Sequence, residues 1–143
     1  MEVKQISLFL ENKKGRLLEA MEVLAKAKIN VRALSIADTS DFGILRLIVP
    51  DPDGAKKVLT KNKFTVKEND VIAVGVSDRP GGLAGILKVL TDADINVEYM
   101  YAFVEKSGRK AVVVLRTDSL SKGKTALKKA GVPVLTPKEV YSL

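Results

Sequence analysis

The sequence predicts an α+β fold built from two copies of one unit of about 70 residues. The first observation is an internal repeat: GRLLEAMEVLAKAKINV (15–31) and GGLAGILKVLTDADINV (81–97) align at an offset of 66, with eight of seventeen positions identical. The second is that the same succession of strand and helix patterns surrounds both stretches. We therefore expect two domains, 1–69 and 70–143, with no Gly/Ser linker at the joint.

The first copy reads as strand, helix, two strands, helix and strand. Val3–Leu10 is the first strand, and the turn ENKKG follows it. The first helix is predicted from apolar residues at i, i+1, i+4, i+7 and i+8, which form one face: Leu17, Leu18, Met21, Leu24 and Ala25.

The rest of the first copy is rich in β-formers. VRALSIA and ILRLIV are expected strands on either side of the polar turn DTSDFG. A second helix is expected to begin near Asp51, with Pro52 in its first turn and with Ala55, Val58 and Leu59 facing inward. Phe64–Val66 would be the last strand.

The second copy repeats this order. Val71–Val76 precedes the turn SDRPG, and the helix face is Leu83, Ala84, Leu87 and Leu90. The strands VEYMYAFV and AVVVL flank EKSGRK, a helix begins near Asp118 and Ser119, with Ala126 and Leu127 facing inward, and Val132–Leu135 is the last strand. One extra residue in the middle turn would match Asp118 with Asp51 at an offset of 67. The order βαββαβ, twice, predicts ferredoxin-like units: antiparallel four-stranded sheets with both helices on one face.

Composition excludes several classes of chemistry. The chain has no Cys and no His, which rules out disulfides, thiolate metal sites and cysteine nucleophiles and removes the commonest general base. No paired carboxylates recur in both copies, so we expect no enzyme, no metal and no cofactor. There is no apolar run of 18 residues and no signal-peptide pattern at the N-terminus, so a cytoplasmic protein without a membrane span is expected.

The net charge of +7 gives little reason to expect nucleic-acid binding. The charge is spread evenly, with +3 in residues 1–70 and +4 in residues 71–143. Nucleic-acid binding usually needs a concentrated patch, and the densest cluster, SKGKTALKK (121–129), reads as the solvated face of a helix.

The glycine-rich stretch SDRPGGLAGIL (77–87) has two interpretations, a phosphate-binding turn or a close helix–sheet connection. A dinucleotide site requires G-x-G-x-x-G in a parallel βαβ unit, whereas the glycines here fall as G-G-x-x-G at 81, 82 and 85. A Walker lysine is also missing. The sequence therefore does not predict a nucleotide site.

The residues D-R-P-G-G-L, a helix and then I-N-V resemble the ACT domain, a small regulatory unit that binds amino acids. Its first turn and helix typically read D/N-x-P-G-x-L followed by I-N-I. The resemblance covers both copies, although the first has Lys14 where the family usually has Pro. A stand-alone pair of such domains is a known arrangement in the family.

The resemblance implies a set of amino-acid-binding residues, usually placed where two ACT units meet. In the second copy these are Asp78, Gly81, Gly82, Leu83 and Asn96. In the first copy they are Asn12, Gly15, Arg16, Leu17 and Asn30. The chemistry suits a zwitterion, because a helix N-terminus attracts a carboxylate and Asp78 could hold an ammonium group. A structural interpretation stays open: Asp78 as a helix cap, and Asn30 and Asn96 as left-handed helix C-caps.

Tyr99, Tyr101 and Phe103 alternate along one strand, where the first copy has Ala33, Ser35 and Ala37. Such a stripe can pack under the helices or across an interface, or it can be a platform for a ligand or for bases. The RNA-binding signature of ferredoxin-like domains is missing.

The predicted function is a sensor of a free amino acid that acts on an unidentified enzyme or regulator in trans. A homodimer through sheet edges is expected, because an edge strand is exposed unless it is paired. Two alternatives remain: a ligand-free subunit that mediates oligomerisation of an enzyme, and, more distantly, a nucleic-acid-binding protein.

Overall fold

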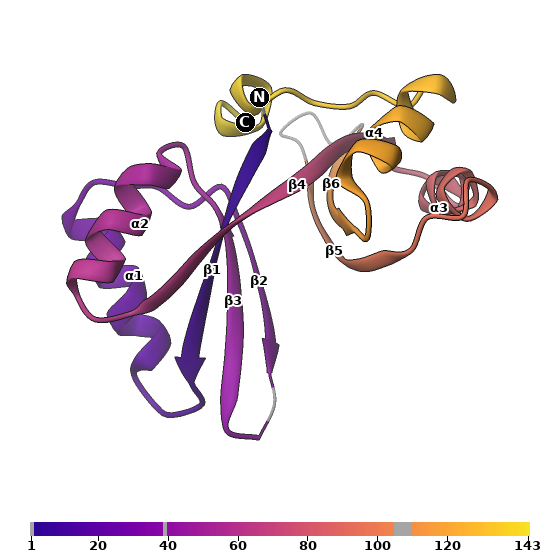
Figure 1. Cartoon of the computed structure of the whole chain (residues 1–143). Helices are drawn as coiled ribbons and strands as arrows, with labels where there is room; N and C mark the ends of the chain where they lie inside the picture. Colours follow the sequence, from indigo (N-terminus) through magenta and orange to yellow (C-terminus); the bar gives the residue numbers. More distant parts are fainter. Residues whose placement is uncertain (1, 39, 105–109) are drawn as a thin grey trace. The chain divides into compact units, whose positions relative to one another are not determined.

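The computed structural model describes residues 2–38, 40–104 and 110–143, and its chain divides into two compact units (Figure 1). The first unit is Lys4–Asn69, and the second is Asp70–Leu143 together with Met1–Val3. The turns expected at DTSDFG and EKSGRK include residues 39 and 105–109, which lie outside the described residues.

The first unit has the predicted βαββαβ order. Its elements are β1 (Val3–Glu11), α1 (Arg16–Lys26), β2 (Ala33–Asp38), β3 (Phe42–Ile48), α2 (Pro52–Lys61) and the beginning of β4 (Thr65–Ser77). The strands lie in the order β2-β3-β1-β4, and β3 pairs antiparallel with both β1 and β2. Both helices lie on one face of this sheet, as Figure 1 shows. The ferredoxin-like prediction is confirmed here.

The second unit repeats the arrangement with a shortened last strand. It consists of the rest of β4, α3 (Gly82–Asp92), β5 (Val97–Val104), β6 (Lys110–Thr117), α4 (Leu120–Lys129) and α5 (Pro137–Tyr141), and its strands lie in the order β4-β6-β5. The strand predicted at Val132–Leu135 is reduced to one bridge, Val74 with Val134, and to two backbone hydrogen bonds beside it. Pro133 cannot donate a backbone hydrogen bond, which limits the ladder on this side.

Strand β4 runs through the predicted joint between the copies. Two strands, Phe64–Val66 and Val71–Val76, were expected with polar residues between them, but Thr65–Ser77 is one continuous strand. The polar residues stay extended, and one of them is anchored: the Ser7 hydroxyl donates to Asn69 Oδ1 at 2.7 Å. The polar residues between the two predicted strands therefore belong to the strand and do not form a loop.

Each unit has its own hydrophobic core under its helices. The first core is formed by Ile6, Leu8, Leu10, Ala20, Leu24, Leu45, Leu47, Val49, Ala55, Leu59 and Phe64. The second is formed by Ile72, Val74, Val76, Ile86, Leu90, Ile95, Val113, Leu115 and Leu127.

The predicted inward face of α1 is partly wrong. Ala20 and Leu24 are the buried residues, whereas Leu17 and Leu18 are 40% and 60% exposed and Ala25 is also exposed. The helix is rotated relative to the prediction, so its first turn presents leucines to solvent. Leu83 in α3 repeats this feature, at 40% exposure.

The second helix of each unit starts at a side-chain cap, as predicted. Asp51 accepts from the backbone N–H of Gly54 at 3.0 Å, and Ser119 accepts from that of Lys122 at 3.4 Å. Ser119, not Asp118, is therefore the counterpart of Asp51, at an offset of 68. The prediction of one extra residue was wrong because Asp and Ser are equally good caps in sequence.

Candidate functional site

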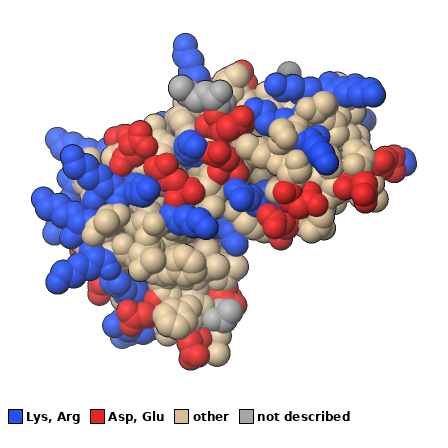
Figure 2. Space-filling view, in the orientation of Figure 1, with Lys and Arg blue, Asp and Glu red and all other residues tan. Residues whose placement is uncertain are grey.

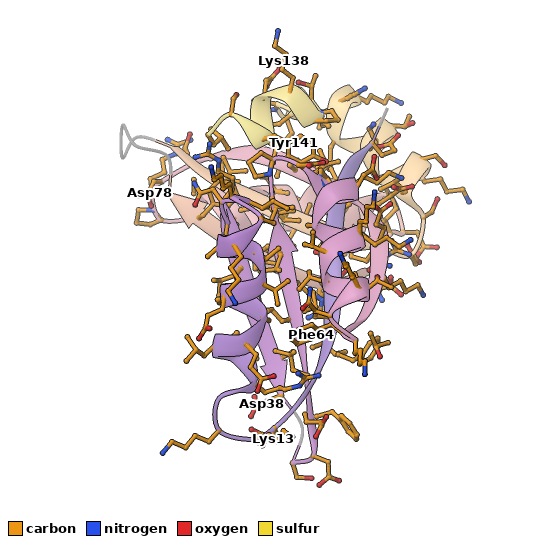
Figure 3. The ribbon with its side chains drawn as sticks, turned by 90° about the vertical axis from the view of Figure 1, so that its left-hand side faces the viewer. Lys13, Asp38, Phe64, Asp78, Lys138 and Tyr141 are labelled. Atoms are coloured by element: carbon orange, nitrogen blue, oxygen red, sulfur yellow. The ribbon has the colours of Figure 1, made fainter. Side chains whose placement is uncertain are left out.

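The turn before the first helix of each unit has the same backbone geometry. Gly15 has φ 88° and ψ −12°, and Gly81 has φ 85° and ψ −9°; each is the N-cap, and neither helix has a side-chain cap. This left-handed conformation favours glycine. Asp78 lies three residues before the cap and is exposed (Figure 3), so the helix-cap interpretation of Asp78 is wrong.

The absence of a side-chain cap leaves backbone donors available. The N–H groups of Leu17 and Leu18, and of Leu83 and Ala84, have no hydrogen-bond acceptor among the residues that the structure describes. Each pair lies in the first turn of a helix, where the helix dipole adds a partial positive charge. Both turns can therefore hold a carboxylate.

The second-unit turn borders a cavity of about 270 Å³. Its lining contains five glycines, namely Gly75, Gly81, Gly82, Gly85 and Gly131. Gly81 and Gly82 of the predicted site are among the lining residues, whereas Asp78, Leu83 and Asn96 are not.

Gly82 sets how closely α3 approaches β4. A Cβ at Gly82 would collide with the backbone oxygen of Ser77 and lie 3.2 Å from Val76 Cγ1. The first unit carries Arg16 at this position, so a shift of the helix can relieve the collision. Gly82→Ala is expected to lower the free energy of unfolding by about 1–3 kcal/mol, as overpacking typically does. Chemical denaturation measures this loss.

Gly85→Ala is the matched control for that variant. A Cβ at Gly85 meets nothing within 4 Å, and the residue lies in the same helix. Alanine there is expected to stabilise the protein by about 0.5–1 kcal/mol, because it restricts the unfolded chain more than glycine does. Equal effects of the two substitutions would contradict the close approach of α3 to β4.

The two predicted asparagines lie at the other end of these helices. The C-caps are Ala27 and Ala93, and the left-handed residues are Lys28 and Asp94, each at φ 59°, so Asn30 and Asn96 are not C-caps as the alternative supposed. Both asparagines are exposed, and their side-chain amides form no hydrogen bond with the described residues. Asn96 is held through its backbone, which pairs with Asp118.

One unit does not bring the turn and the asparagine together. They are separated by a helix of 11 residues, which spans about 16 Å at the usual rise. A single small ligand cannot contact both ends of the same helix.

Asn12 in the first unit has a local role. Its backbone N–H donates to the Asp41 carbonyl at 2.9 Å, and its side-chain amide donates to the Ser40 carbonyl at 3.4 Å. These bonds tie the turn after β1 to the β2–β3 connection.

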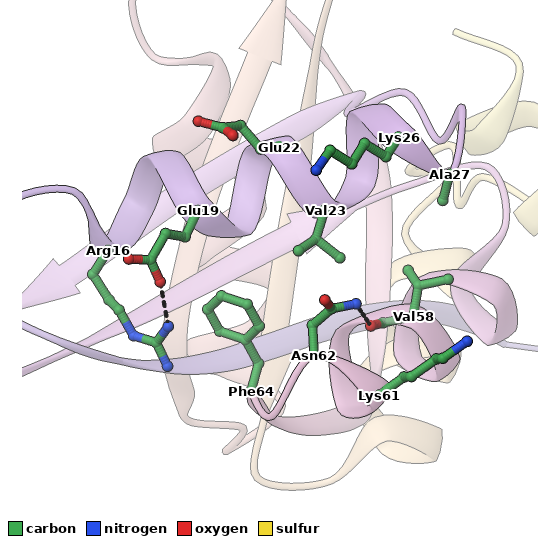
Figure 4. A pocket seen from close by; sticks show the side chains of 10 residues that line it. All are labelled: Arg16, Glu19, Glu22, Val23, Lys26, Ala27, Val58, Lys61, Asn62 and Phe64. Atoms are coloured by element: carbon green, nitrogen blue, oxygen red, sulfur yellow. Dashed lines mark hydrogen bonds and ion pairs between the residues drawn. The ribbon is translucent and has the colours of Figure 1, made fainter.

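Arg16 lies in a groove between α1 and α2, shown in Figure 4. Its guanidinium carbon is 4.2 Å from the ring centroid of Phe64, and its Nη1 donates to Glu19 at 2.7 Å. The groove has a volume of about 580 Å³. Phe64, Lys26 and Asn62 also line the groove, and none of them was a predicted site residue.

The aromatic stripe of β5 faces away from the helices. Tyr99, Tyr101 and Phe103 lie opposite Arg116, Val114 and Val112 on β6, whereas the core residues Val113 and Leu115 point to the other face. The three aromatic side chains are half-buried. Packing under the helices, one of the predicted roles, is therefore wrong.

The described residues lack a metal-binding cluster and a membrane-spanning helix. No group of three or more His, Cys, Asp or Glu side chains there is arranged to hold a metal ion. In the same residues, every helix is too short or too polar to cross a bilayer.

Comparison with known proteins identifies one family. A family model described as an ACT domain pair matches residues 1–142. Protein BT0572 from Bacteroides thetaiotaomicron, a solved structure, is 45% identical, has a TM-score of 0.95, and aligns over 100% of this chain and 98% of its own. No curated protein matches the sequence significantly.

More distant structures share the fold. The regulatory subunit of aspartate kinase from Thermus thermophilus is 15% identical with a TM-score of 0.66, over 91% of this chain and 93% of that one. The corresponding subunit from Thermus flavus is 16% identical with a TM-score of 0.59, over 92% and 94%. With the family match over nearly every residue, two βαββαβ units and the repeated glycine turn, this chain belongs to the ACT domain pair family.

Proposed function

We propose that this protein is a regulatory subunit that binds a free amino acid and acts on a partner enzyme or regulator in trans, without catalysing a reaction itself. The observation that carries the proposal is the repeated turn: a left-handed glycine followed by two unpaired backbone N–H groups. Such a group of donors fits the carboxylate of an amino acid. Asp78 and the exposed amides of Asn30 and Asn96 supply groups for the ammonium.

The proposed site is shared between two ACT domains, with boundaries at 1–69 and 70–143. The turn and the asparagine of one domain are about 16 Å apart along the helix, farther than an amino acid reaches. A ligand that contacts both kinds of group must take them from different domains. Ligand binding would then favour one packing of the domains, which the partner recognises.

The structural neighbours support a regulatory role. Two of them are regulatory subunits of aspartate kinase, with nearly the same length as this chain. A chain with this fold and of this length therefore occurs as a regulatory subunit in those two proteins.

The test is thermal unfolding in the presence of each of the twenty free amino acids. One or two of them are expected to stabilise the protein, by about 2.7 kcal/mol at 100-fold excess over the dissociation constant. Asp78→Asn is expected to weaken this effect, because it removes the charge that would face the ammonium. Asp53→Asn, an exposed aspartate outside the proposed site, serves as the control.

A flat response to all twenty amino acids would refute ligand sensing. The remaining function would be the ligand-free assembly subunit, recognised by a stoichiometric enzyme partner in a pull-down.

A further inference from the structure

The groove between α1 and α2 of the first unit has the size of a small-molecule site. Its volume is about 580 Å³, and ligand pockets range from about 300 to 1,000 Å³. On the α1 side, the groove is lined by Arg16, Glu19, Val23 and Lys26, which lie on one face of the helix. The opposite wall comes from α2 and the residues after it, including Val58, Lys61, Asn62 and Phe64.

The guanidinium of Arg16 is positioned to bind an anion. Its side chain is only 19% exposed and lies over the Phe64 ring, which is itself part of the core. Its Nε is buried without a hydrogen bond, with Glu11 Oε1 at 4.0 Å. Stacking of this kind fixes the guanidinium without using all its donors.

Among the described residues, Arg16 forms one ion pair shorter than 3 Å, and this pair is weak in its setting. Glu19, its partner at 2.7 Å, has a side chain that is 59% exposed. Exposed pairs contribute little, because water competes and two flexible side chains are ordered. A ligand carboxylate can therefore replace Glu19 at little cost.

Two more cationic side chains line the groove and are available to bind an anion. Lys26 and Lys61 form no ion pair with the residues that the structure describes. In Figure 4, Lys26 reaches back along α1 toward the Arg16 end, while Glu22 points away from Phe64. Figure 2 shows Lys and Arg gathered over α1 and α2, a field that attracts anions.

The floor of the groove is apolar. Val23, Val58 and Phe64 line it, and Phe64 is 5% exposed. A ligand held here would bury a hydrocarbon or aromatic part against these side chains while its anionic group met Arg16.

The second unit has lost these features at the equivalent positions. In the second unit, Arg16 is replaced by Gly82, Glu19 by Gly85, Lys26 by Asp92 and Phe64 by Val132. Lys88 and Asp92 are paired with each other at 2.8 Å, and this hydrogen bond raises the pKa of Lys88. The charge pattern of the groove belongs to the first unit alone.

We infer that the α1–α2 groove of the first unit binds a small organic anion that carries an apolar or aromatic body, at a site that shares only Arg16 with the predicted amino-acid-binding residues. Arg16 binds the anionic group, Lys26 adds a second positive charge, and Phe64 with the two valines contacts the apolar part. Apart from Arg16, the groove contains none of the predicted amino-acid-binding residues, so the inference does not require amino-acid sensing.

The test is a titration of the full chain with 3-phenylpropanoate, followed by ¹H–¹⁵N correlation NMR. Backbone amides of α1 and α2 are expected to shift saturably, with a dissociation constant on the order of millimolar for a fragment of this size. The neutral isostere 3-phenylpropanamide is expected to bind about tenfold more weakly, because it lacks the charge-assisted hydrogen bond.

Variants distinguish the groove from general attraction to a basic surface. Arg16→Gln is expected to weaken binding of 3-phenylpropanoate about tenfold or more. Lys26→Gln, at an exposed position that folding tolerates, is expected to weaken it about threefold. Lys88→Gln, on the corresponding helix of the second unit, is expected to leave it unchanged.

Three results would overturn the inference: no saturable shift in α1 and α2, equal binding of the amide, or wild-type binding by the Arg16 and Lys26 variants. Failure of the amino-acid panel would not overturn the inference, because Lys26, Phe64 and the two valines of the groove take no part in the proposed amino-acid site.

Discussion

Leu59→Ala and Leu127→Ala are each expected to lower the free energy of unfolding by about 3 kcal/mol, within the 2–5 kcal/mol usual for such cavities. Both leucines are fully buried, and they occupy equivalent positions in α2 and α4. Leu59 belongs to the first core and Leu127 to the second, and no residue belongs to both cores. Each substitution should therefore weaken its own unit.

Native-state hydrogen exchange measures where the stability is lost. A change of about 3 kcal/mol corresponds to a loss of protection of more than 100-fold in the unit that carries the substitution. Thr60→Ala, next to Leu59 but exposed, is the control and should change protection little. If each leucine variant lowered protection equally in both units, the continuous strand β4 would couple them, and residue 70 would not separate two domains.

Much of the fold follows from the sequence because the repeat supplies two independent readings of it. Several features that both copies signal are predicted correctly, namely the glycine before α1 and α3 and the hairpin strands. A residue type that is compatible with several local structures in one copy becomes informative when the same type occupies the equivalent position of the other copy.

Errors remain where a residue pattern fits more than one arrangement, as in the first helical turns, where Leu17 and Leu83 were predicted to face inward and are exposed in both copies. Lys28 and Asp94 adopt left-handed backbone conformations, although neither residue type predicts one. The nearby Asn30 and Asn96, whose residue type favours that conformation, do not adopt it. Helix α5 was missed although Thr136 caps it with Pro137 next and Glu139 three positions on, a recognisable start signal.

The groove could not be predicted from sequence. Arg16 and Phe64 are 48 positions apart, and each is unremarkable in its own segment: one begins a helix, the other closes a core. Their stacking depends on how α1 and α2 pack in three dimensions. By contrast, the turn and asparagine positions came from the ACT resemblance, and the structure adds that one unit holds them at opposite ends of a helix.

Strand β2 is the edge of the first unit's sheet, and its apolar residues are unusually exposed. Leu34 and Ile36 lie opposite the core residues Leu47 and Leu45 of β3, yet they are 51% and 45% exposed. The equivalent positions of β5 are Met100, which is half-buried, and Ala102. An exposed apolar edge strand favours pairing with another strand, so we propose that β2 pairs with β2 of a second copy.

Ile36→Lys is expected to convert that homodimer into a monomer, raising the dissociation constant at least about 100-fold. In a twofold interface the substitution places two ammonium groups close to each other, and a like-charge contact across an interface costs several kcal/mol. Sedimentation velocity over a range of protein concentrations measures the change.

Phe9→Lys is the matched control, because Phe9 is also 45% exposed but lies on the central strand β1, opposite Ile44 on the face away from the core. It should leave the dissociation constant unchanged. A monomeric wild type would refute the edge-paired dimer, and a dimer lost equally in both variants would place the interface on the sheet face. Only loss in Ile36→Lys alone fits pairing of β2 edges.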